Sequence, residues 1–232
     1  LLVRGFCRAG QDEIVICPPT FGMYEFYAQV QGAGIRRIPL DRDSGYTLPV
    51  DEICAQWTAQ SKLVFVCSPN NPTGNFLPGA QVKAFLQAMP KDVVVVLDEA
   101  YNEYLPPADR VDTLAWVKEF PNLVVTRTFS KIHGLAGLRV GYAVTTAEIA
   151  DLMHRVRQPF NVNNLALAGA IAALDDHAFI AASFDNNRRG MEQIVAGLKR
   201  LGLEHIPSHG NFVTFKAGEA AKVNQALLKQ GV

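Results

Sequence analysis

The stretch VVVVLDEAYNEY, residues 93–104, indicates the fold class. Its four successive valines, Val93–Val96, do not alternate with polar residues, which is typical of a strand that is covered on both faces. Asp98 follows near the end of this strand, and a carboxylate there needs a partner because burying it alone is too costly. The pattern predicts a central strand of a covered parallel sheet, with polar side chains at its carboxyl end.

Similar short apolar runs lie on both sides of this stretch. Together with the run at 93–99, they predict six strands, at 13–17, 36–40, 62–68, 93–99, 123–129 and 139–145. Amphipathic stretches predict helices at about 22–33, 50–59, 78–89 and 113–120. Alternation of strand and helix implies right-handed crossovers and a mostly parallel sheet, so we expect a three-layer α/β fold.

The pattern changes after about residue 146. Helical periodicity runs through 147–157, 164–176 and 177–202, and a strand-like run at 211–217 precedes a helical stretch at 219–230. We therefore expect a large α/β domain over 1–175 and the first part of a smaller α+β domain over 176–232. The opening LLVRGF is typical of the last turns of a helix, so we also expect a fragment that lacks both ends of a longer protein.

Composition argues against several classes of protein. Twenty-two basic residues balance twenty-two acidic ones without a basic cluster, which disfavours tight nucleic-acid binding. No apolar run approaches the ~20 residues of a membrane-spanning helix. The four cysteines, Cys7, Cys17, Cys54 and Cys67, have no C-x-x-C spacing, and the histidines show no metal-ligand pattern. We therefore expect neither a metal site nor a disulfide framework, and we expect the thiols to be reduced, as in a cytoplasm.

The candidate site lies where three predicted strands end. The strand at 62–68 runs into PNNPTGN, and the strand at 123–129 runs into SKIHGLAGLR. Because ligands of open parallel sheets bind beyond the carboxyl ends of the strands, we expect the polar residues of these segments to converge there. They are Asn71, Asp98, Tyr101, Ser130 and Lys131.

Two of these residues admit more than one interpretation. Asp98 is either a helix N-cap or arginine partner, or the permanent partner of a cationic ring nitrogen. At ~4 Å and an effective dielectric near 20, such a pair is worth about 4 kcal/mol before desolvation. Asn71 belongs either to a plain tight turn or to a turn that holds its amide towards a phenolate oxygen, with Tyr101 as a second donor.

The surroundings of Lys131 suggest a phosphate. Thr128, Ser130 and Arg139 supply two hydroxyls and a guanidinium, and a guanidinium binds phosphate through paired charge-assisted hydrogen bonds. The alternative is a solvated turn between two strands. Neither a Walker A loop nor a G-x-G-x-x-G fingerprint occurs, so the phosphate does not belong to an ATP or NAD held in those ways.

The order and spacing of these residues resemble those of the fold-type I pyridoxal-phosphate enzymes. Within that group, five motifs resemble the histidinol-phosphate aminotransferases of the class I/II aminotransferase family: CPPTFGMYEFY, VCSPNNPTGN, LDEAYNEY, TFSKIHGLAGLRVGY and PFNVNNLALAGAIAAL. The resemblance covers essentially the whole chain. It implies the large domain of that fold type, with part of its small domain.

The resemblance also implies roles for the residues at the strand ends. Lys131 would bind pyridoxal 5′-phosphate covalently and move the proton at the substrate's α-carbon. Asp98 would pair with the pyridinium nitrogen, so that the ring can withdraw electrons. Asn71 and Tyr101 would bond the cofactor's phenolic oxygen.

Further roles concern the phosphate and the ring face. Arg139 and Ser130, together with Thr128, would hold the phosphate. Phe21, where the family often has tyrosine, would stack on the pyridine ring; the alternative is a plain core aromatic. In related enzymes the Asn-Pro bond of the turn can be cis, so we expect a cis Asn71–Pro72 bond.

The implied activity is transamination between histidinol phosphate and 2-oxoglutarate in histidine biosynthesis, by a cytoplasmic homodimer. Relatives that act on aromatic amino acids or decarboxylate threonine phosphate share the motifs, and so do transcription regulators with an aminotransferase-like sensor domain. A generic α/β binding domain without cofactor is a further alternative. The family's N-terminal arm, phosphate-facing first loop and substrate-reading C-terminal arginine have no counterpart here, so we expect weak cofactor binding.

Overall fold

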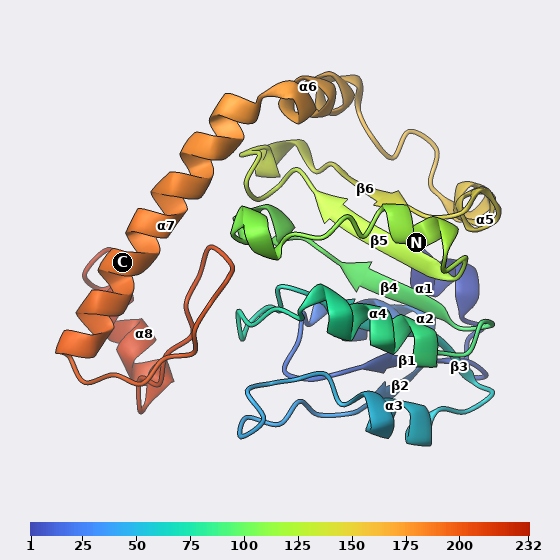
Figure 1. Ribbon diagram of the computed structural model, residues 1–232, viewed down its shortest axis with the longest axis horizontal. Coiled ribbons are helices and arrows are strands. Elements are labelled where there is room, and N and C mark those ends of the chain that lie inside the picture. Colours follow the sequence, from blue (N-terminus) through green and yellow to red (C-terminus); the bar gives the residue numbers. More distant parts are fainter.

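The computed structural model describes residues 1–232 and contains one six-stranded sheet in the order β2-β1-β3-β4-β5-β6 (Figure 1). Neighbours from β2 to β5 are parallel, and only the edge strand β6 runs antiparallel, against β5. The mostly parallel sheet predicted from the sequence is therefore confirmed. The strands are β1 (Glu13–Ile16), β2 (Gly34–Arg37), β3 (Ser61–Cys67), β4 (Val94–Asp98), β5 (Leu123–Thr128) and β6 (Gly141–Val144).

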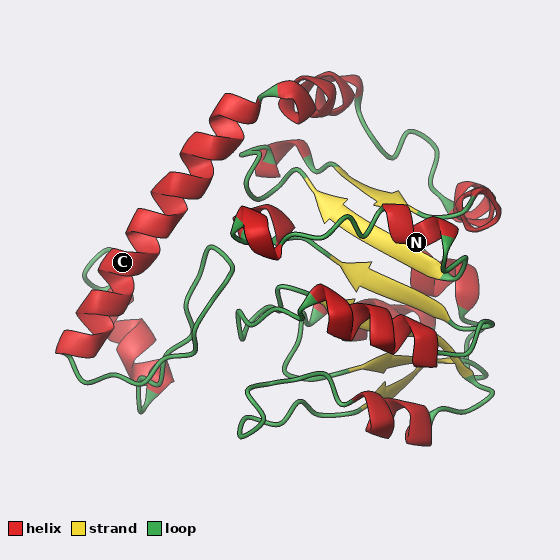
Figure 2. Ribbon diagram, in the orientation of Figure 1, coloured by secondary structure: helices red, strands yellow, loops and turns green.

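Eight α-helices accompany the sheet (Figure 2). They are α1 (Leu2–Phe6), α2 (Met23–Gln31), α3 (Val50–Gln56), α4 (Gly79–Ala88), α5 (Ala147–Val156), α6 (Asn164–Asp175), α7 (His177–Arg200) and α8 (Ala220–Leu228). Short 3₁₀ turns occur at Asn102–Tyr104, Pro107–Asp109, Ala115–Lys118 and Ala136–Leu138.

The sheet is the middle of three layers. One buried cluster joins Val95 and Leu97 of β4 to Phe85 of α4, while a second joins Val94 and Val96 to Ala28 of α2. Successive valines thus face opposite layers, as side chains of a strand must. All four residues of Val93–Val96 are at most 6% exposed, which confirms the prediction of a strand that is covered on both faces.

Three predicted elements differ from the structure. The run at 36–40 forms its strand earlier, at Gly34–Arg37, and Pro39 cannot donate a ladder hydrogen bond. The helix expected at 113–120 is a 3₁₀ turn at Ala115–Lys118, since Pro121 disfavours helical geometry in the residue before it. The strand expected at 211–217 is reduced to one bridge between His205 and Phe215.

The C-terminal part of the chain leaves the sheet along α7, and a long loop leads from there to α8 (Figure 1). No single helix has the length and apolar character to cross a membrane. Helices α6 and α7, bent by 79° at their junction, pass such a test only as a pair and by length and composition alone.

A buried ion pair lies next to Asp98 in the sequence. Glu99 is 4% exposed in its side chain, and both Nε and Nη2 of Arg127 donate to its Oε2, at 2.9 and 2.7 Å. The hydroxyl of Thr113 donates to Oε1 at 2.7 Å. Burial raises the pKa of Glu99, although Arg127 and Thr113 oppose that shift. Arg127 on β5 therefore compensates a carboxylate at the end of β4.

We expect Arg127→Met to destabilise the protein by about 3–5 kcal/mol, because it leaves Glu99 buried without a cation. Glu99→Gln in the same chain should recover most of that loss, since the neutral amide needs no counter-charge. Urea unfolding of both single variants and the double variant measures the effect. Equal instability of Arg127→Met and the double variant would contradict this role of the pair.

Candidate active site

The carboxyl ends of β3, β4 and β5 meet at one edge of the sheet. The register sets Cys67 of β3 beside Asp98 of β4, and Asp98 beside Thr126 of β5. The segments that follow these strands contain the polar residues predicted to converge. The shared edge is a consequence of the parallel topology, so strands far apart in sequence contribute to one site.

Asp98 is held by hydrogen bonds from three directions. The hydroxyl of Tyr24 donates to Oδ2 at 2.6 Å, and the amide of Ala100 donates to Oδ1 at 3.2 Å. The side chain of Thr126 is a further donor. The nearby Arg127 pairs with Glu99 instead, so the interpretation of Asp98 as an arginine partner is wrong.

Burial raises the pKa of the Asp98 carboxyl group. Hydrogen bonds from Tyr24 and Thr126, and the charge of Lys131, oppose that shift. The pKa of Tyr24 lies well above its ordinary value because the ring is buried and faces the carboxylate. The phenol therefore stays protonated and remains a donor to Asp98.

Tyr24 was not among the residues predicted from the sequence. It lies in the first turn of α2, three residues after Phe21, and its ring stacks on Phe65 of β3 with centroids 4.5 Å apart. Phe21 precedes the N-cap Gly22, so helical spacing does not relate the two rings. Nothing in the sequence pairs this tyrosine with a residue 74 positions away.

Asn71, Tyr101 and Lys131 lie together, as predicted. The side-chain amide of Asn71 donates to the hydroxyl of Tyr101 at 3.2 Å. The ammonium of Lys131 lies 5.0 Å from the centre of the Tyr101 ring, within the range of a cation–π contact. Lys131 takes part in no ion pair, so its ammonium has no fixed carboxylate partner.

The turn that carries Asn71 is fixed by its neighbours. The side chain of Asn70 accepts from the Thr20 hydroxyl at 3.0 Å and donates to the Thr73 hydroxyl at 2.7 Å. The Asn71–Pro72 bond is cis, as expected. The interpretation as a tight turn and the interpretation as a held amide are thus compatible.

The predicted phosphate-binding residues lie at the end of β5 and in the segment that follows it, and only Thr128 and Ser130 are hydrogen-bonded to each other. The amide of Ser130 donates to the Thr128 hydroxyl at 3.1 Å. Arg139 is exposed, has a left-handed backbone with φ of +54°, and donates to the carbonyl of Ala136 at 2.8 Å. A shared phosphate contact of Thr128, Ser130 and Arg139 stays a prediction.

Phe21 is 39% exposed, so the interpretation as a plain core aromatic is wrong. Its ring meets Tyr24 edge-on, with centroids 5.5 Å apart. An exposed aromatic face beside the partner of Asp98 is available to a flat ligand.

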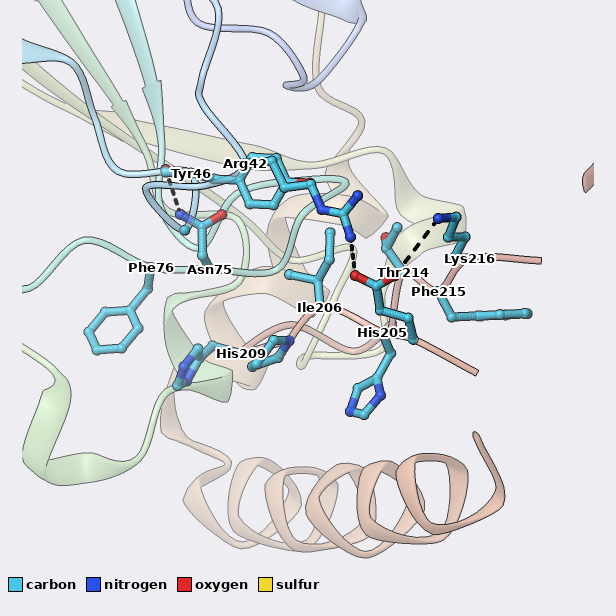
Figure 3. A pocket seen from close by; sticks show the side chains of 13 residues that line it. Arg42, Tyr46, Asn75, Phe76, His205, Ile206, His209, Thr214, Phe215 and Lys216 are labelled. Atoms are coloured by element: carbon cyan, nitrogen blue, oxygen red, sulfur yellow. Dashed lines mark hydrogen bonds and ion pairs between the residues drawn. The ribbon is translucent and has the colours of Figure 1, made fainter. Parts of the chain in front are cut away.

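A separate open cavity of about 650 Å³ lies between the loop 42–46 and the segment 204–216 (Figure 3). Asn75 and Phe76 of the Asn71 turn are among the residues that line it, as are His209 and Thr214, and the rings of Phe76 and His209 meet with centroids 4.5 Å apart. None of the predicted site residues lines this cavity. The cavity therefore adjoins the turn without containing the site itself.

We expect Tyr24→Phe to destabilise the protein by about 1.5–3 kcal/mol at pH 8, because a buried carboxylate loses a hydrogen bond. The folded-state pKa of Asp98, already raised by burial, rises further in this variant. The loss should therefore shrink as the pH falls towards the unfolded-state value near ~3.9, where Asp98 is protonated.

Urea unfolding at pH 8 and at lower pH measures this dependence, with Tyr27→Phe as control because Tyr27 is 56% exposed on the same helix. A loss in Tyr24→Phe that does not change with pH would show that Asp98 is not involved.

Comparisons with known proteins agree with this geometry. The family model described as "Aminotransferase class I and II" matches residues 1–232. Histidinol-phosphate aminotransferase 1 of Dechloromonas aromatica is 60% identical over 232 residues, which are all of this chain and 63% of that protein. Histidinol-phosphate aminotransferase 1 of Thiobacillus denitrificans is 54% identical over 100% of this chain and 59% of its own length. The chain thus spans about three fifths of these relatives.

Solved structures show the same fold. Histidinol-phosphate aminotransferase from Sinorhizobium meliloti, in complex with pyridoxal-5′-phosphate, has a TM-score of 0.88 at 29% identity and covers 99% of this chain and 61% of its own. Aspartate aminotransferase from Thermus thermophilus with maleate also has a TM-score of 0.88, at 23% identity, covering 100% and 63%. The chain belongs to the class I and II aminotransferase family.

Proposed function

We propose that this chain is the central part of a pyridoxal-phosphate-dependent aminotransferase that acts on histidinol phosphate and 2-oxoglutarate. One observation carries the proposal: a buried carboxylate, an unpaired lysine and an amide–phenol pair lie at one edge of the sheet. Asp98 supplies the carboxylate, Lys131 the amine, and Asn71 with Tyr101 the pair.

These residues fit the chemistry of pyridoxal phosphate. Asp98 is buried and is hydrogen-bonded only by neutral donors, so no cation bonds it directly and a pyridinium nitrogen would supply one. The Lys131 ammonium has no ion-pair partner and is available to the cofactor's aldehyde group. Asn71 and Tyr101 present neighbouring polar atoms that suit a phenolic oxygen.

When bound, pyridoxal phosphate supplies an electron sink for the electrons of the substrate's α-carbon. In this proposal Asp98 keeps the ring nitrogen protonated, and Tyr24 holds the Asp98 carboxylate in place. Lys131 would hold the cofactor's aldehyde group and, as a free amine, would accept and return the proton of the α-carbon. Phe21 covers one face of the ring.

The phosphate group is assigned to the loop after β5. Thr128 and Ser130 supply hydroxyls, and Arg139 supplies a guanidinium after rotating away from the carbonyl of Ala136. Binding at this remote group would keep the ring fixed while Lys131 is free of it.

The choice of amino donor rests on the relatives. At 60% and 54% identity, the two bacterial relatives are both named histidinol-phosphate aminotransferases, which favours that substrate over aromatic amino acids or threonine phosphate. The same relationship disfavours a transcription regulator with a sensor domain. We also propose that the protein is a cytoplasmic homodimer without nucleic-acid or membrane partners. Its large domain would include residues 1–175, and residues 176–232 would form the first part of its small domain.

In the full-length protein that contains this chain, we expect Lys131→Ala to abolish transamination of histidinol phosphate with 2-oxoglutarate. Asp98→Ala should lower kcat about a thousandfold, because it removes a pair worth roughly 4 kcal/mol. Lys91→Ala, at an exposed turn, is the control and should leave the rate unchanged. A coupled assay of glutamate formation measures all three.

Near-normal turnover of Lys131→Ala would rule out the mechanism. A protein active on another amino donor but not on histidinol phosphate would overturn the substrate while leaving the roles of Lys131 and Asp98 intact.

A further inference from the structure

A segment near the C-terminus, Ser208–Thr214, lies directly against the turn that carries Asn71; we call it the docking segment. Its backbone amide at His209 donates to the carbonyl of Gly74 at 2.7 Å. Its hydroxyl at Thr214 donates to the carbonyl of Pro72. Figure 3 shows His209 and Thr214 beside the large cavity described above. The docking segment is thus tied at two points to the backbone next to Asn71.

Gly74 permits this close approach. A Cβ atom at this position would lie 2.3 Å from Oγ and 2.8 Å from Cα of Ser208, and the backbone has φ of +79°. A backbone Cα cannot move away without moving the docking segment. Gly218 shares the left-handed conformation, with φ of +65°, but has open space around it. An alanine at Gly218 would therefore suffer only backbone strain, whereas an alanine at Gly74 would also clash with Ser208.

Phe212 extends the docking segment to Tyr101. The two rings meet edge-to-face, with centroids 5.2 Å apart and planes at 76°. A Cβ at Gly210 would lie 2.6 Å from the Phe212 ring, so this glycine lets the ring fold back. The carbonyl of Gly210 accepts from the side chain of Asn187 on α7 at 3.2 Å. Helix α7 thereby helps to hold the ring against Tyr101.

Tyr101 contacts both Asn71 and Lys131. Its hydroxyl accepts from Asn71, and its ring faces the Lys131 ammonium. Tyr101 is 4% exposed and Phe212 is half-buried against it. A displacement of Phe212 would therefore change the packing that fixes the direction of the Tyr101 hydroxyl.

We propose that Phe212 is a positioning residue for Tyr101, and that the docking segment transmits the placement of the C-terminal part of the chain to the Asn71–Tyr101 pair. The proposal rests on the proposed function, in which this pair bonds the cofactor's phenolic oxygen. Phe212 itself acts only through Tyr101.

The docking is tested without cofactor by hydrogen exchange at the His209 amide. Gly74→Ala should speed this exchange by about tenfold or more relative to Gly218→Ala, because only the former excludes Ser208. Thr214→Val, which removes the hydroxyl bond to Pro72, should act in the same direction and serves if Gly74→Ala does not fold. Unchanged protection in Thr214→Val and in a folded Gly74→Ala would overturn the docking.

The role of Phe212 is tested by the pH midpoint of the visible absorption of bound pyridoxal phosphate. A donor to the phenolic oxygen favours its ionised form, so Phe212→Ala should raise the midpoint by roughly half a pH unit. Combined with Tyr101→Phe it should add nothing further, because its effect passes through the tyrosine hydroxyl. Phe215→Ala, at a 38% exposed ring beyond the docking segment, is the control.

A midpoint that does not move in Phe212→Ala, or that moves equally with and without the Tyr101 hydroxyl, would overturn the role of Phe212 alone. If the full-length protein that contains this chain takes up no pyridoxal phosphate, the proposed function and the Phe212 role fail together, while the exchange result still decides the docking.

Discussion

The burial of the Asp98 carboxylate at the end of a central strand is the constraint on which the site depends. A parallel strand covered on both faces leaves its last side chain with little water, so the carboxylate must be held by the protein. Tyr24 does so at 2.6 Å, and burial still raises the pKa of Asp98. This residual cost is what a cationic ring nitrogen would relieve, and it explains why an acidic residue occupies a position otherwise suited to valine.

The same topology places the remaining groups. Parallel strands bring their carboxyl ends to one edge, so the loops after β3, β4 and β5 deliver Asn71, Tyr101 and Lys131 to the same place. At the same strand ends, Arg127 compensates the charge of the buried Glu99 carboxylate. The docking segment approaches from the far end of the chain, and Gly74 admits it because no side chain stands in the way.

Much of this was predictable from the sequence, because it depends on local patterns. The valine run predicted the central strand, and polar residues after strands predicted the meeting of Asn71, Asp98, Tyr101 and Lys131. Contacts between segments distant in sequence were not predictable: the bond from Tyr24 to Asp98 and the contact of Phe212 with Tyr101 depend on tertiary packing. The prediction of a strand at 211–217 was wrong, because an apolar run forms a strand only beside a pairing partner, and here only one bridge forms.

The central claim is that these residues assemble a site for pyridoxal phosphate with Lys131 as its covalent partner. The most direct measurement is incubation with pyridoxal 5′-phosphate, reduction with borohydride, digestion, and location of the modified lysine by mass spectrometry. The account predicts selective modification of Lys131 over the other lysines, since only Lys131 faces the buried edge of the sheet beside Asp98 and Tyr101. Modification spread evenly over exposed lysines, with Lys131 no more reactive than the rest, would contradict it.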